Sequence, residues 1–295
     1  MKIYAVIVTY NAMRNSWIEK SLRSLQESTV SIIPIVIDNG STDETREFVP
    51  SHFPEAIWLP QDKNLGFGQA NNVGLRYALE HDADYVLLLN QDATIGHDAI
   101  EKMIVHSGNN YLFSPLHLNG DGSRLDYSFK KCLAVSDNSM LDDFLIRGKL
   151  HSIYTGPSRE TCCVIPAACW FVPISIIKTI GGFNPLFFHY SEDENYFRRL
   201  YYHHIGIMVC PQATMYHDRQ VHGNLQMFNS NNILRKMLLV ATDINLSFGQ
   251  QIIWYLRIIK NSPKHFMVSL PQLIGKYGKV RKSRRLEKGT GATWL

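Results

Sequence analysis

Four short polar clusters contain the side chains that could bind a ligand. They are Thr9-Tyr10-Asn11, Asp38-Asn39, Asn64-Leu65-Gly66 and Asn90-Gln91-Asp92. Their hydroxyl, amide and carboxylate groups can hydrogen-bond a polar molecule from several sides. Each cluster follows a short apolar run. The clusters form one site if those runs are strands that end at the same edge of a sheet.

The order of apolar runs and helical patterns predicts such a sheet. Strands are expected at Ile3–Val8, Ile32–Ile37, Ile57–Leu59 and Tyr85–Leu89. Helices are expected at Asn15–Gln26, at Asp43–Val49 and directly after Gly68. Repeated strand–helix units imply a mainly parallel sheet, and such sheets bind ligands beyond the carboxyl ends of their strands. We therefore expect all four clusters to converge on one crevice.

The rest of the chain contains a weaker region and then a second ordered region. The weaker region, from Asp98 to about Thr161, has polar turns and a short helical pattern near Leu141–Ile146. The second region runs from Val164 through Gly181-Gly182-Phe183 to an acidic helix, Glu192–Tyr202, and on through Ile205–Val209 and Pro211–Tyr216 to His217. Amphipathic helices are expected at Asn231–Ala241 and Gln250–Lys260.

Length and composition indicate one catalytic body with an added part. The chain has 295 residues, 45% of them hydrophobic and 19% charged, which suits a sizeable core and excludes a disordered protein. We expect residues 1–97 and 98–225 to form two halves of one domain, followed by a helical extension with a basic tail, 226–295. The five cysteines include an adjacent pair and no CxxC spacing, which favours buried free thiols. They are Cys132, Cys162, Cys163, Cys169 and Cys210.

The N-terminal segment has no signal-peptide pattern, and no apolar run reaches the roughly 18 residues of a membrane span. We therefore expect a cytoplasmic protein. The formal net charge is +4, but Lys276 to Lys288 contains seven Lys or Arg against Glu287, which leaves about −2 for the rest. A near-neutral body excludes a nucleic-acid binder, whereas a short polybasic tail suits an anionic membrane surface, with the enzyme peripheral on the inner face. A disordered, solubilising tail is the alternative.

Seven motifs in order resemble the family 2 glycosyltransferases, most closely their bacterial rhamnosyltransferase-like branch. They are Val-Thr-Tyr-Asn (8–11), Val-Ile-Asp-Asn-Gly-Ser-Thr-Asp (36–43), Asn-Leu-Gly-Phe-Gly (64–68), Asn-Gln-Asp (90–92), Gly-Gly-Phe (181–183), Glu-Asp-Glu-Asn (192–195) and His217. The resemblance implies the α/β GT-A fold, a Rossmann-like, mainly parallel central sheet flanked by helices. It also implies inverting transfer of a sugar from a nucleoside diphosphate sugar to an acceptor hydroxyl. The acceptor would be a saccharide or lipid-linked saccharide in capsule, O-antigen or other cell-surface polysaccharide assembly.

The resemblance also assigns residues that bind the donor. Thr9 and Asn11 lie where the family's first strand meets the nucleotide, and Asp38 accepts hydrogen bonds from the base or ribose. Gly66 and Gly68 permit close backbone approach, and Asn71 reaches the base. Tyr10, Asn39, Asn64, Asn90 and Gln91 complete the predicted donor site. The plainer reading of residues 38–43 is an Asx turn with a helix cap, made by Ser41 and Asp43.

The predicted metal site consists of Asp92 and His217. A leaving diphosphate needs a divalent cation, and Asp92 matches the last acid of the family's metal motif. Asn90 replaces the first acid, which leaves a site with few protein ligands, as suits Mg²⁺ or Mn²⁺. His217 matches a histidine that completes the coordination, and His222 is the alternative.

The acidic helix supplies the predicted catalytic base. The resemblance assigns deprotonation of the acceptor hydroxyl to Asp193 and positioning of the acceptor to Glu192. Arg198 or Arg199 would pair with carboxylates or diphosphate, or lie on a solvated helix face. Trp170 would line the acceptor pocket or belong to the core.

Three other functions compete with this hypothesis. A dinucleotide-dependent oxidoreductase is suggested by the glycines of residues 66–71, but the third glycine is missing and the loop follows the third strand. A sugar-phosphate nucleotidyltransferase would need a Gly-rich, Arg-containing loop after the first strand. A non-catalytic scaffold of glycosyltransferase shape would not need Asp92, Asp193 and His217 together.

Overall fold

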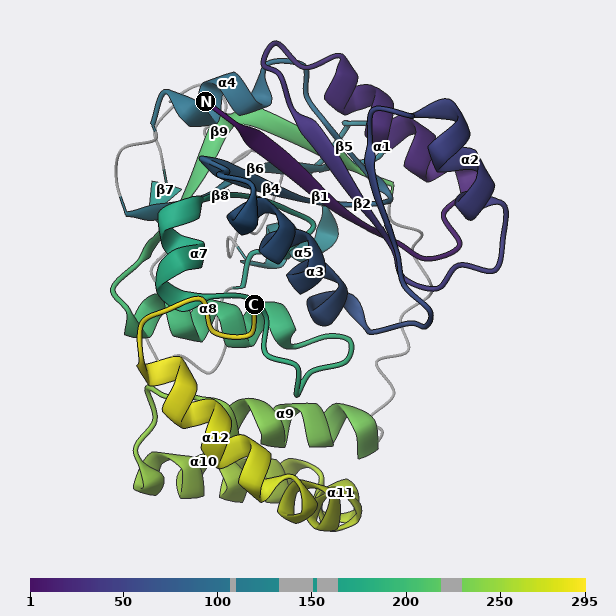
Figure 1. Ribbon diagram of the computed structural model, residues 1–295. Coiled ribbons are helices and arrows are strands. Elements are labelled where there is room, and N and C mark those ends of the chain that lie inside the picture. Colours follow the sequence, from purple (N-terminus) through teal and green to yellow (C-terminus); the bar gives the residue numbers. More distant parts are fainter. Residues whose placement is uncertain (107–109, 133–150, 153–163, 219–229) are drawn as a thin grey trace.

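A computed structural model describes residues 1–106, 110–132, 151–152, 164–218 and 230–295. Figure 1 shows a central sheet covered by helices, with the C-terminal helices packed below it. The predicted helix near Leu141–Ile146, the cysteines Cys162 and Cys163, and His222 lie outside the described residues. Cys169 and Cys210 are buried free thiols, as predicted for them.

The first half of the sheet is parallel, as predicted from the strand–helix order. Its strands are β1 (Ile3–Thr9), β2 (Ile33–Asp38), β3 (Ile57–Pro60) and β4 (Tyr85–Asn90), in the order β3-β2-β1-β4. The helices between them are α1 (Trp17–Gln26), preceded by a 3-10 turn, α2 (Thr45–His52) and α3 (Phe67–Glu80). Thr9 pairs with Asp38, and Val8 pairs with Asn90, so the strand ends lie side by side.

The second half of the sheet mixes both directions. Beyond β4 the sheet continues through β8 (Cys169–Pro173), β6 (Tyr111–Asn119), β9 (Gly206–His217) and β5 (Ala93–Ile95), and β7 (His151–Ser152) also pairs with β9. The β6–β9 pair is parallel, and the other pairs here are antiparallel. The helices of this half are α4 (Ala99–Ile104), α5 (Tyr127–Cys132), α7 (Ile174–Ile180) and α8 (Glu192–Tyr202). The β4–β8 pair joins both predicted halves of the domain in one sheet.

Apolar side chains cover both faces of the sheet. Along β1, Tyr4 and Val6 face the core on the side of α3, α7 and α8, whereas Ile3, Ala5 and Ile7 face the core on the side of α1, α2 and α4. A strand that is buried on both faces is apolar throughout, which explains why β1 and β4 read as uninterrupted hydrophobic runs.

The chain ends in four helices, α9 (Ser230–Thr242), α10 (Phe248–Asn261), α11 (Pro263–Gly275) and α12 (Tyr277–Lys288). The sequence predicted α9 and α10. The basic tail, left open above as a membrane-binding or a disordered segment, is helix α12. Among the described residues, no helix is both long and apolar enough to span a bilayer.

Helix α12 and the last residues of the chain pack on the catalytic body. Buried Glu287 accepts a hydrogen bond of 2.7 Å from Asn184 Nδ2 and lies 3.9 Å from the Arg199 guanidinium of α8. Farther on, Gly182 N donates to the Thr293 carbonyl at 2.8 Å. At Gly181 (φ +72°) a Cβ would lie 1.9 Å from the Thr293 carbonyl oxygen, which explains the glycine there.

Candidate active site

The loops after β2 and β3 are joined by two asparagines of the predicted donor site. Asn39 Nδ2 donates to Asn64 Oδ1 at 3.1 Å, and Asn39 Oδ1 accepts from Leu65 N at 2.7 Å. Asn64 Oδ1 also accepts from Gly66 N at 2.8 Å. Two side-chain amides therefore fix the backbone of the glycine loop that precedes α3.

The loop after β1 is held against the segment that begins α2. Asn11 adopts a left-handed conformation (φ 50°), which its short polar side chain tolerates. Asn11 N donates to Ser41 Oγ at 3.0 Å, and Asn11 Oδ1 accepts from Thr42 N at 2.8 Å. Asp43 accepts from Met13 N and Thr45 N, so Ser41 and Asp43 order the two loops.

The polar atoms of three predicted donor ligands are engaged within the protein. Thr9 is buried, and its hydroxyl donates to the Ile37 carbonyl. Asn71 is buried and donates to the Phe67 carbonyl. Asp38, fully buried, accepts from Ser41 N at 3.0 Å and from Arg46 Nε at 2.7 Å.

Contact of Thr9, Asp38 and Asn71 with a donor therefore stays a prediction. The sequence analysis missed Arg46, although its position eight residues after Asp38, in the first turn of the next helix, was a usable signal. Its partly exposed guanidinium covers the Asp38 carboxylate.

Tyr10, Asn90 and Gln91 lie at the adjoining ends of β1 and β4. Tyr10 N donates to Gln91 Oε1 at 2.8 Å, and the Tyr10 side chain is exposed. Asn90 Oδ1 is buried and has no hydrogen-bond partner among the described residues. An unpaired buried carbonyl oxygen is costly, so this oxygen suits a ligand or water.

The structure brings the two predicted metal ligands together from distant parts of the chain. Asp92 Oδ1 lies 3.2 Å from His217 Nε2, because β5 pairs with the end of β9. On the other side of the ring, Asp126 Oδ2 lies 3.8 Å from His217 Nδ1. Asp126 is buried and accepts from Ser128 N and Phe129 N at the start of α5.

The sequence reading missed Asp126. A carboxylate behind the second ring nitrogen orients an imidazole whose first nitrogen binds a metal. The described residues contain no group of three His, Cys, Asp or Glu that could hold a metal by themselves. Asp92 and His217 would therefore supply only part of a coordination shell.

The predicted catalytic acids begin α8 and lie against the glycine loop. Tyr190 and Ser191, directly before the helix, both have left-handed backbones (φ 67° and 73°), which non-glycine residues adopt at a cost. Beside them, Phe67 N donates to the Phe188 carbonyl at 3.1 Å. A Cβ on Gly68 would lie 3.4 Å from Glu192 Cβ. The start of α8, with Glu192, and the predicted donor loop therefore meet.

Both acids hold their protons more tightly than ordinary carboxylic acids. Burial, and then the charge of Asp193, raises the pKa of Glu192 to about 7, against a smaller lowering by Arg235 of α9. Burial raises the pKa of Asp193 to about 6, against hydrogen bonds from the backbone of Glu194 and Ala167. The Asp193 side chain retains some exposure, whereas Glu192 Oε2 is buried and has no hydrogen-bond partner in the described part of the chain. Carboxyls with pKa values near neutrality suit proton transfer.

The other residues considered on α8 and β8 have structural roles. Arg198 pairs with Glu194 and Asp243, both at 2.5 Å. Arg199 is buried and donates to the carbonyls of Ile180 and Gly182. Trp170 is a core residue that packs on Phe183 and donates to the Ile165 carbonyl.

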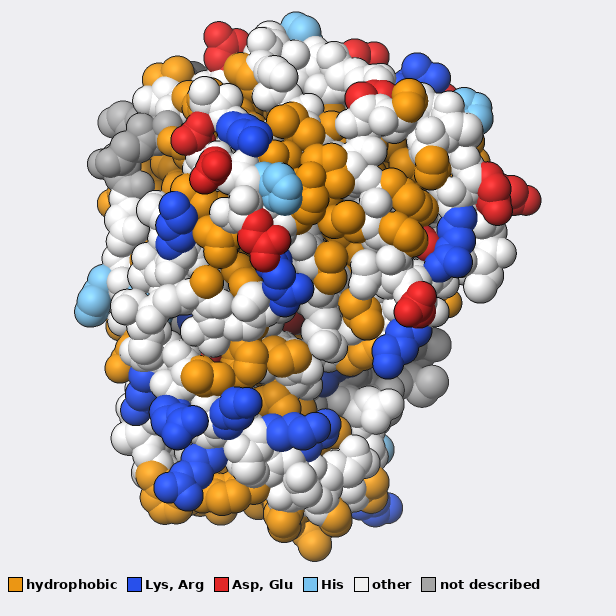
Figure 2. Space-filling view, viewed as in Figure 1, with side chains coloured by type: hydrophobic (Ala, Val, Ile, Leu, Met, Phe, Trp, Pro, Cys, Tyr) orange, Lys and Arg blue, Asp and Glu red, His pale blue; other side chains and the backbone are white. Residues whose placement is uncertain are grey.

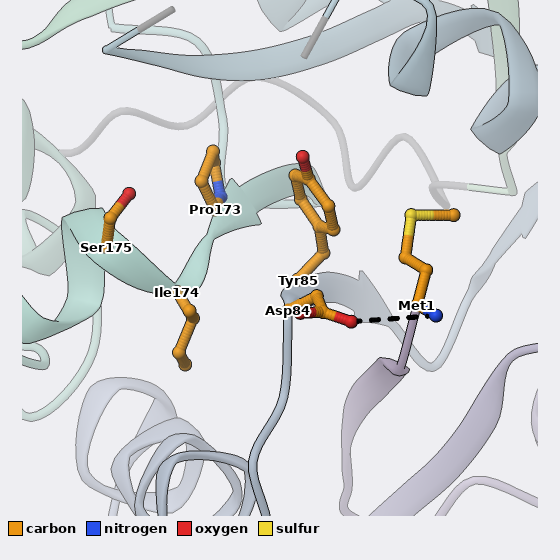
Figure 3. Close-up of a pocket in the computed structure, with 6 residues that line it drawn as sticks. All are labelled: Met1, Asp84, Tyr85, Pro173, Ile174 and Ser175. Atoms are coloured by element: carbon orange, nitrogen blue, oxygen red, sulfur yellow. Dashed lines mark ion pairs between the residues drawn. The ribbon is translucent and has the colours of Figure 1, made fainter. Parts of the chain in front are cut away.

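The pocket drawn in Figure 3 lies at the opposite end of the strands, where β4 begins and β8 ends. It is lined by Met1, Asp84, Tyr85, Pro173, Ile174 and Ser175. It contains none of the predicted site residues.

The sequence also matches known proteins. The model of the family "Glycosyl transferase family 2" matches residues 4–134, from β1 to just beyond α5. This match, together with the relatives described below, supports a family 2 glycosyltransferase. The rhamnosyltransferases among those relatives support the rhamnosyltransferase-like branch of this family. The relatives are named hexosyltransferases and rhamnosyltransferases, which supports a glycosyltransferase enzyme over the oxidoreductase, the nucleotidyltransferase and the non-catalytic scaffold.

Several relatives match over about two thirds of this chain or more. A low-salt glycan biosynthesis hexosyltransferase, Agl10, of Haloferax volcanii is 25% identical over 229 residues, 73% of this chain and 67% of that protein. An N-acetylglucosaminyl-diphospho-decaprenol L-rhamnosyltransferase of Mycobacterium tuberculosis is 26% identical over 64% of this chain and 66% of its own length. The dTDP-rhamnosyl transferase RfbF of Shigella flexneri is 26% identical over 73% of this chain and 68% of its own length.

A solved structure supports the fold. The crystal structure of S. aureus TarS 1-349 in complex with UDP superposes with a TM-score of 0.59 at 15% identity, covering 98% of this chain and 90% of that one. The predicted GT-A fold of this family 2 glycosyltransferase is confirmed.

Proposed function

We propose that this glycosyltransferase transfers one sugar from a nucleoside diphosphate sugar to an acceptor hydroxyl with inversion at the anomeric carbon. The observation that carries the proposal is the contact between the start of α8, which holds the acid pair, and the glycine-rich start of α3: Glu192 lies against Gly68, and Phe67 N donates to the Phe188 carbonyl. That contact brings a proton acceptor to the loop that the family resemblance assigns to the donor.

Asp193 is the proposed base because its carboxyl is the more exposed of the two and is held at the N-terminus of α8. It takes the proton of the acceptor hydroxyl as that oxygen attacks the anomeric carbon. The bond from the anomeric carbon to the diphosphate oxygen breaks, and its electron pair leaves with the diphosphate. Attack from the face opposite the leaving group inverts the configuration. Glu192 positions the acceptor.

Asp92 and His217 would hold a divalent cation. The pair suits Mg²⁺ or Mn²⁺, because one carboxylate and one imidazole leave positions for water and phosphate oxygens. The buried Asn90 Oδ1, without a hydrogen-bond partner among the described residues, adds an oxygen at the end of β4. When bound, the cation would neutralise the negative charge on the departing diphosphate. Asp126 would keep His217 Nε2 directed toward Asp92.

The relatives' names suggest the substrates. RfbF is named for dTDP-rhamnose and the mycobacterial relative for a saccharide on a prenyl diphosphate. We propose a deoxyhexose donor of this kind and a lipid-linked saccharide acceptor in cell-surface polysaccharide assembly. The enzyme would then work at the cytoplasmic face of the membrane, with the basic segment Lys276 to Lys288 toward anionic lipid.

The test is a transfer assay with a panel of nucleoside diphosphate sugars that includes dTDP-rhamnose, with Mn²⁺ or a chelator. NMR of the product should show an anomeric configuration opposite to that of the donor. Retention would overturn the proposed displacement. Failure of every donor to stabilise the protein thermally in the presence of Mn²⁺ would overturn the proposed donor class.

A further inference from the structure

Helix α10 lies on the surface without burying any of its residues. Its exposed large side chains include Phe248, 78% exposed, and Leu256, 59% exposed. The exposed apolar set on α10, α11 and the start of α12 is Phe248, Ile252, Ile253, Leu256, Ile259, Met267, Val268, Ile274 and Tyr277. Most of the exposed α10 residues share one face at helical spacing. Apolar surface concentrated in this way marks an interaction site.

The same three helices are strongly basic. Residues 244–295 contain ten Lys and Arg and one acid, Glu287, which is buried against Asn184 and Arg199. The ten are Arg257, Lys260, Lys264, Lys276, Lys279, Arg281, Lys282, Arg284, Arg285 and Lys288. All except Lys276 and Arg284 are exposed. Figure 2 shows Lys and Arg side chains gathered over the lower part of the molecule, next to an apolar rim at its bottom edge.

We propose that α10, α11 and α12 form a docking surface for an anionic lipid bilayer. The apolar side chains of α10 and α11 enter the boundary between headgroups and acyl chains, and the Lys and Arg side chains contact lipid phosphates. This surface extends the proposed function, because a lipid-linked acceptor lies in the membrane. It differs from binding by a basic tail alone, since it requires the apolar face as well as the charge.

The charges decide between a bilayer and other occupants of the apolar face. A second copy would bring the same basic surface to the interface, and the exposed residues of 244–295 include no acid to pair with it. Nucleic acid would pair with the Lys and Arg side chains, but it offers nothing to cover the exposed aliphatic side chains of α10. A bilayer with anionic headgroups supplies both the apolar interior and the negative charge.

The docking surface is rigidly connected to the catalytic acids. Helix α9 packs on α10 and α11 through Ile233, Met237 and Phe266. At its other end α9 meets α8, where Asn195 Nδ2 donates to Thr242 Oγ1 and Arg198 pairs with Asp243. Figure 1 shows α9 between α8 and α10. Docking would therefore place the acid pair at a set height above the bilayer.

The test is flotation of the full chain with vesicles of phosphatidylcholine alone or mixed with phosphatidylglycerol. Wild type should bind the mixed vesicles. Ile252→Ser/Leu256→Ser should lower the partition coefficient at least tenfold, whereas Val105→Ser, an exposed apolar position on the far body, should leave it unchanged. The double variant Lys279→Gln/Lys282→Gln should lower the partition coefficient about fivefold for each charge removed at low salt, and by less at high salt. The control Lys20→Gln/Lys178→Gln removes the same charge from the catalytic body and should leave the partition coefficient nearly unchanged.

A second measurement reports how deeply helix α10 enters the bilayer. Brominated acyl chains should quench the fluorescence of a tryptophan introduced on the exposed apolar face by Phe248→Trp, and should quench one introduced on the far body by Val105→Trp much less. Binding that survives Ile252→Ser/Leu256→Ser would overturn the proposal, as would self-association of the chain through this face without vesicle binding. These outcomes are separate from those for the proposed function, because donor binding and sugar transfer to a soluble acceptor are measured without vesicles.

Discussion

At the scale of single residues, Asp193 and Glu192 lie side by side yet should give different kinetic signatures. Asp193→Asn keeps the size of the side chain but cannot accept the acceptor's proton, so we expect transfer to fall by roughly two to four orders of magnitude. Donor affinity should barely change. Glu192→Gln should act mainly on acceptor KM. A transfer assay with parallel donor titration checks both, and near-normal turnover of Asp193→Asn would move the role of base to Glu192 or Glu194.

The raised pKa values of this pair predict a pH profile. Since the base must be ionised, kcat/KM should rise with pH and level off above the apparent pKa values of the pair, about 6 and about 7. The contribution of this pair to the free energy of unfolding should instead fall as pH rises. A carboxyl with a raised folded-state pKa stabilises the fold at low pH, and that contribution is lost as pH rises from the unfolded value through about 7. A kcat/KM that is flat from acid to neutral pH would exclude both acids as the base.

The Asp92–His217–Asp126 arrangement predicts graded effects on metal dependence. Asp92→Ala and His217→Ala remove proposed ligands and should weaken Mn²⁺-dependent binding of the nucleoside diphosphate, most at low Mn²⁺. Asp126→Asn only loosens the orientation of His217, and we expect about tenfold to hundredfold weaker metal affinity. Calorimetry across a Mn²⁺ titration measures all three. Unchanged nucleotide affinity in Asp92→Ala and His217→Ala would exclude a metal at this pair.

At the scale of elements, the glycine loop before α3 should tolerate no side chain at Gly66. Gly66 has a positive φ (+81°), and a Cβ there would lie 2.0 Å from the Phe188 carbonyl oxygen. Gly66→Ala should therefore separate the loop from the turn before α8, costing about 1–3 kcal/mol of stability and weakening donor binding. Gly249→Ala, where a Cβ meets nothing within 4 Å, is the matched control. Equal urea midpoints for both variants would contradict this account.

The sequence predicts elements well where one periodicity dominates. Strands β1, β2 and β4 are buried on both faces and read as apolar runs, and α8 was predicted with the bounds that the structure shows. Helix α12 was not predicted, because its inward positions, Val280, Ser283 and Glu287, are mostly polar. Buried contacts with Asn184 and Arg199 stabilise that helix, and those contacts are tertiary.

In the candidate site, too, the sequence predicted the residues that belong to short motifs and missed those that only folding brings into place. Asp92 and His217 were predicted from short motifs, and the structure places them in contact. Asp126 and Arg235 were not predicted, because a lone acid in a polar turn and a lone arginine on an amphipathic helix resemble ordinary surface residues. Only the folded chain brings Asp126 to the His217 ring and the Arg235 charge near Glu192.

At the scale of the whole molecule, Glu287 ties the helical extension to the catalytic body. Glu287→Ala removes an acceptor from Asn184 and a carboxylate from buried Arg199, so we expect a loss of about 3 kcal/mol in the free energy of unfolding. Exposed Lys288→Gln, on the same turn, should change it by no more than about 0.5 kcal/mol. Urea denaturation measures both. Equal stabilities would show that α12 is held by its apolar contacts alone.

The contact between the C-terminal residues and the Gly181-Gly182 turn also affects how the protein should be handled. Leu295 packs against the core, and Thr293 accepts the Gly182 N–H next to Phe183, which in turn packs beside Gly68. An affinity tag fused after Leu295, or trimming of the last few residues during purification, would disturb this turn. Met1 is exposed at the opposite end of the strands. A tag placed before Met1 should therefore preserve turnover, and lost activity in a shortened chain would report damage near the acids rather than weaker lipid binding.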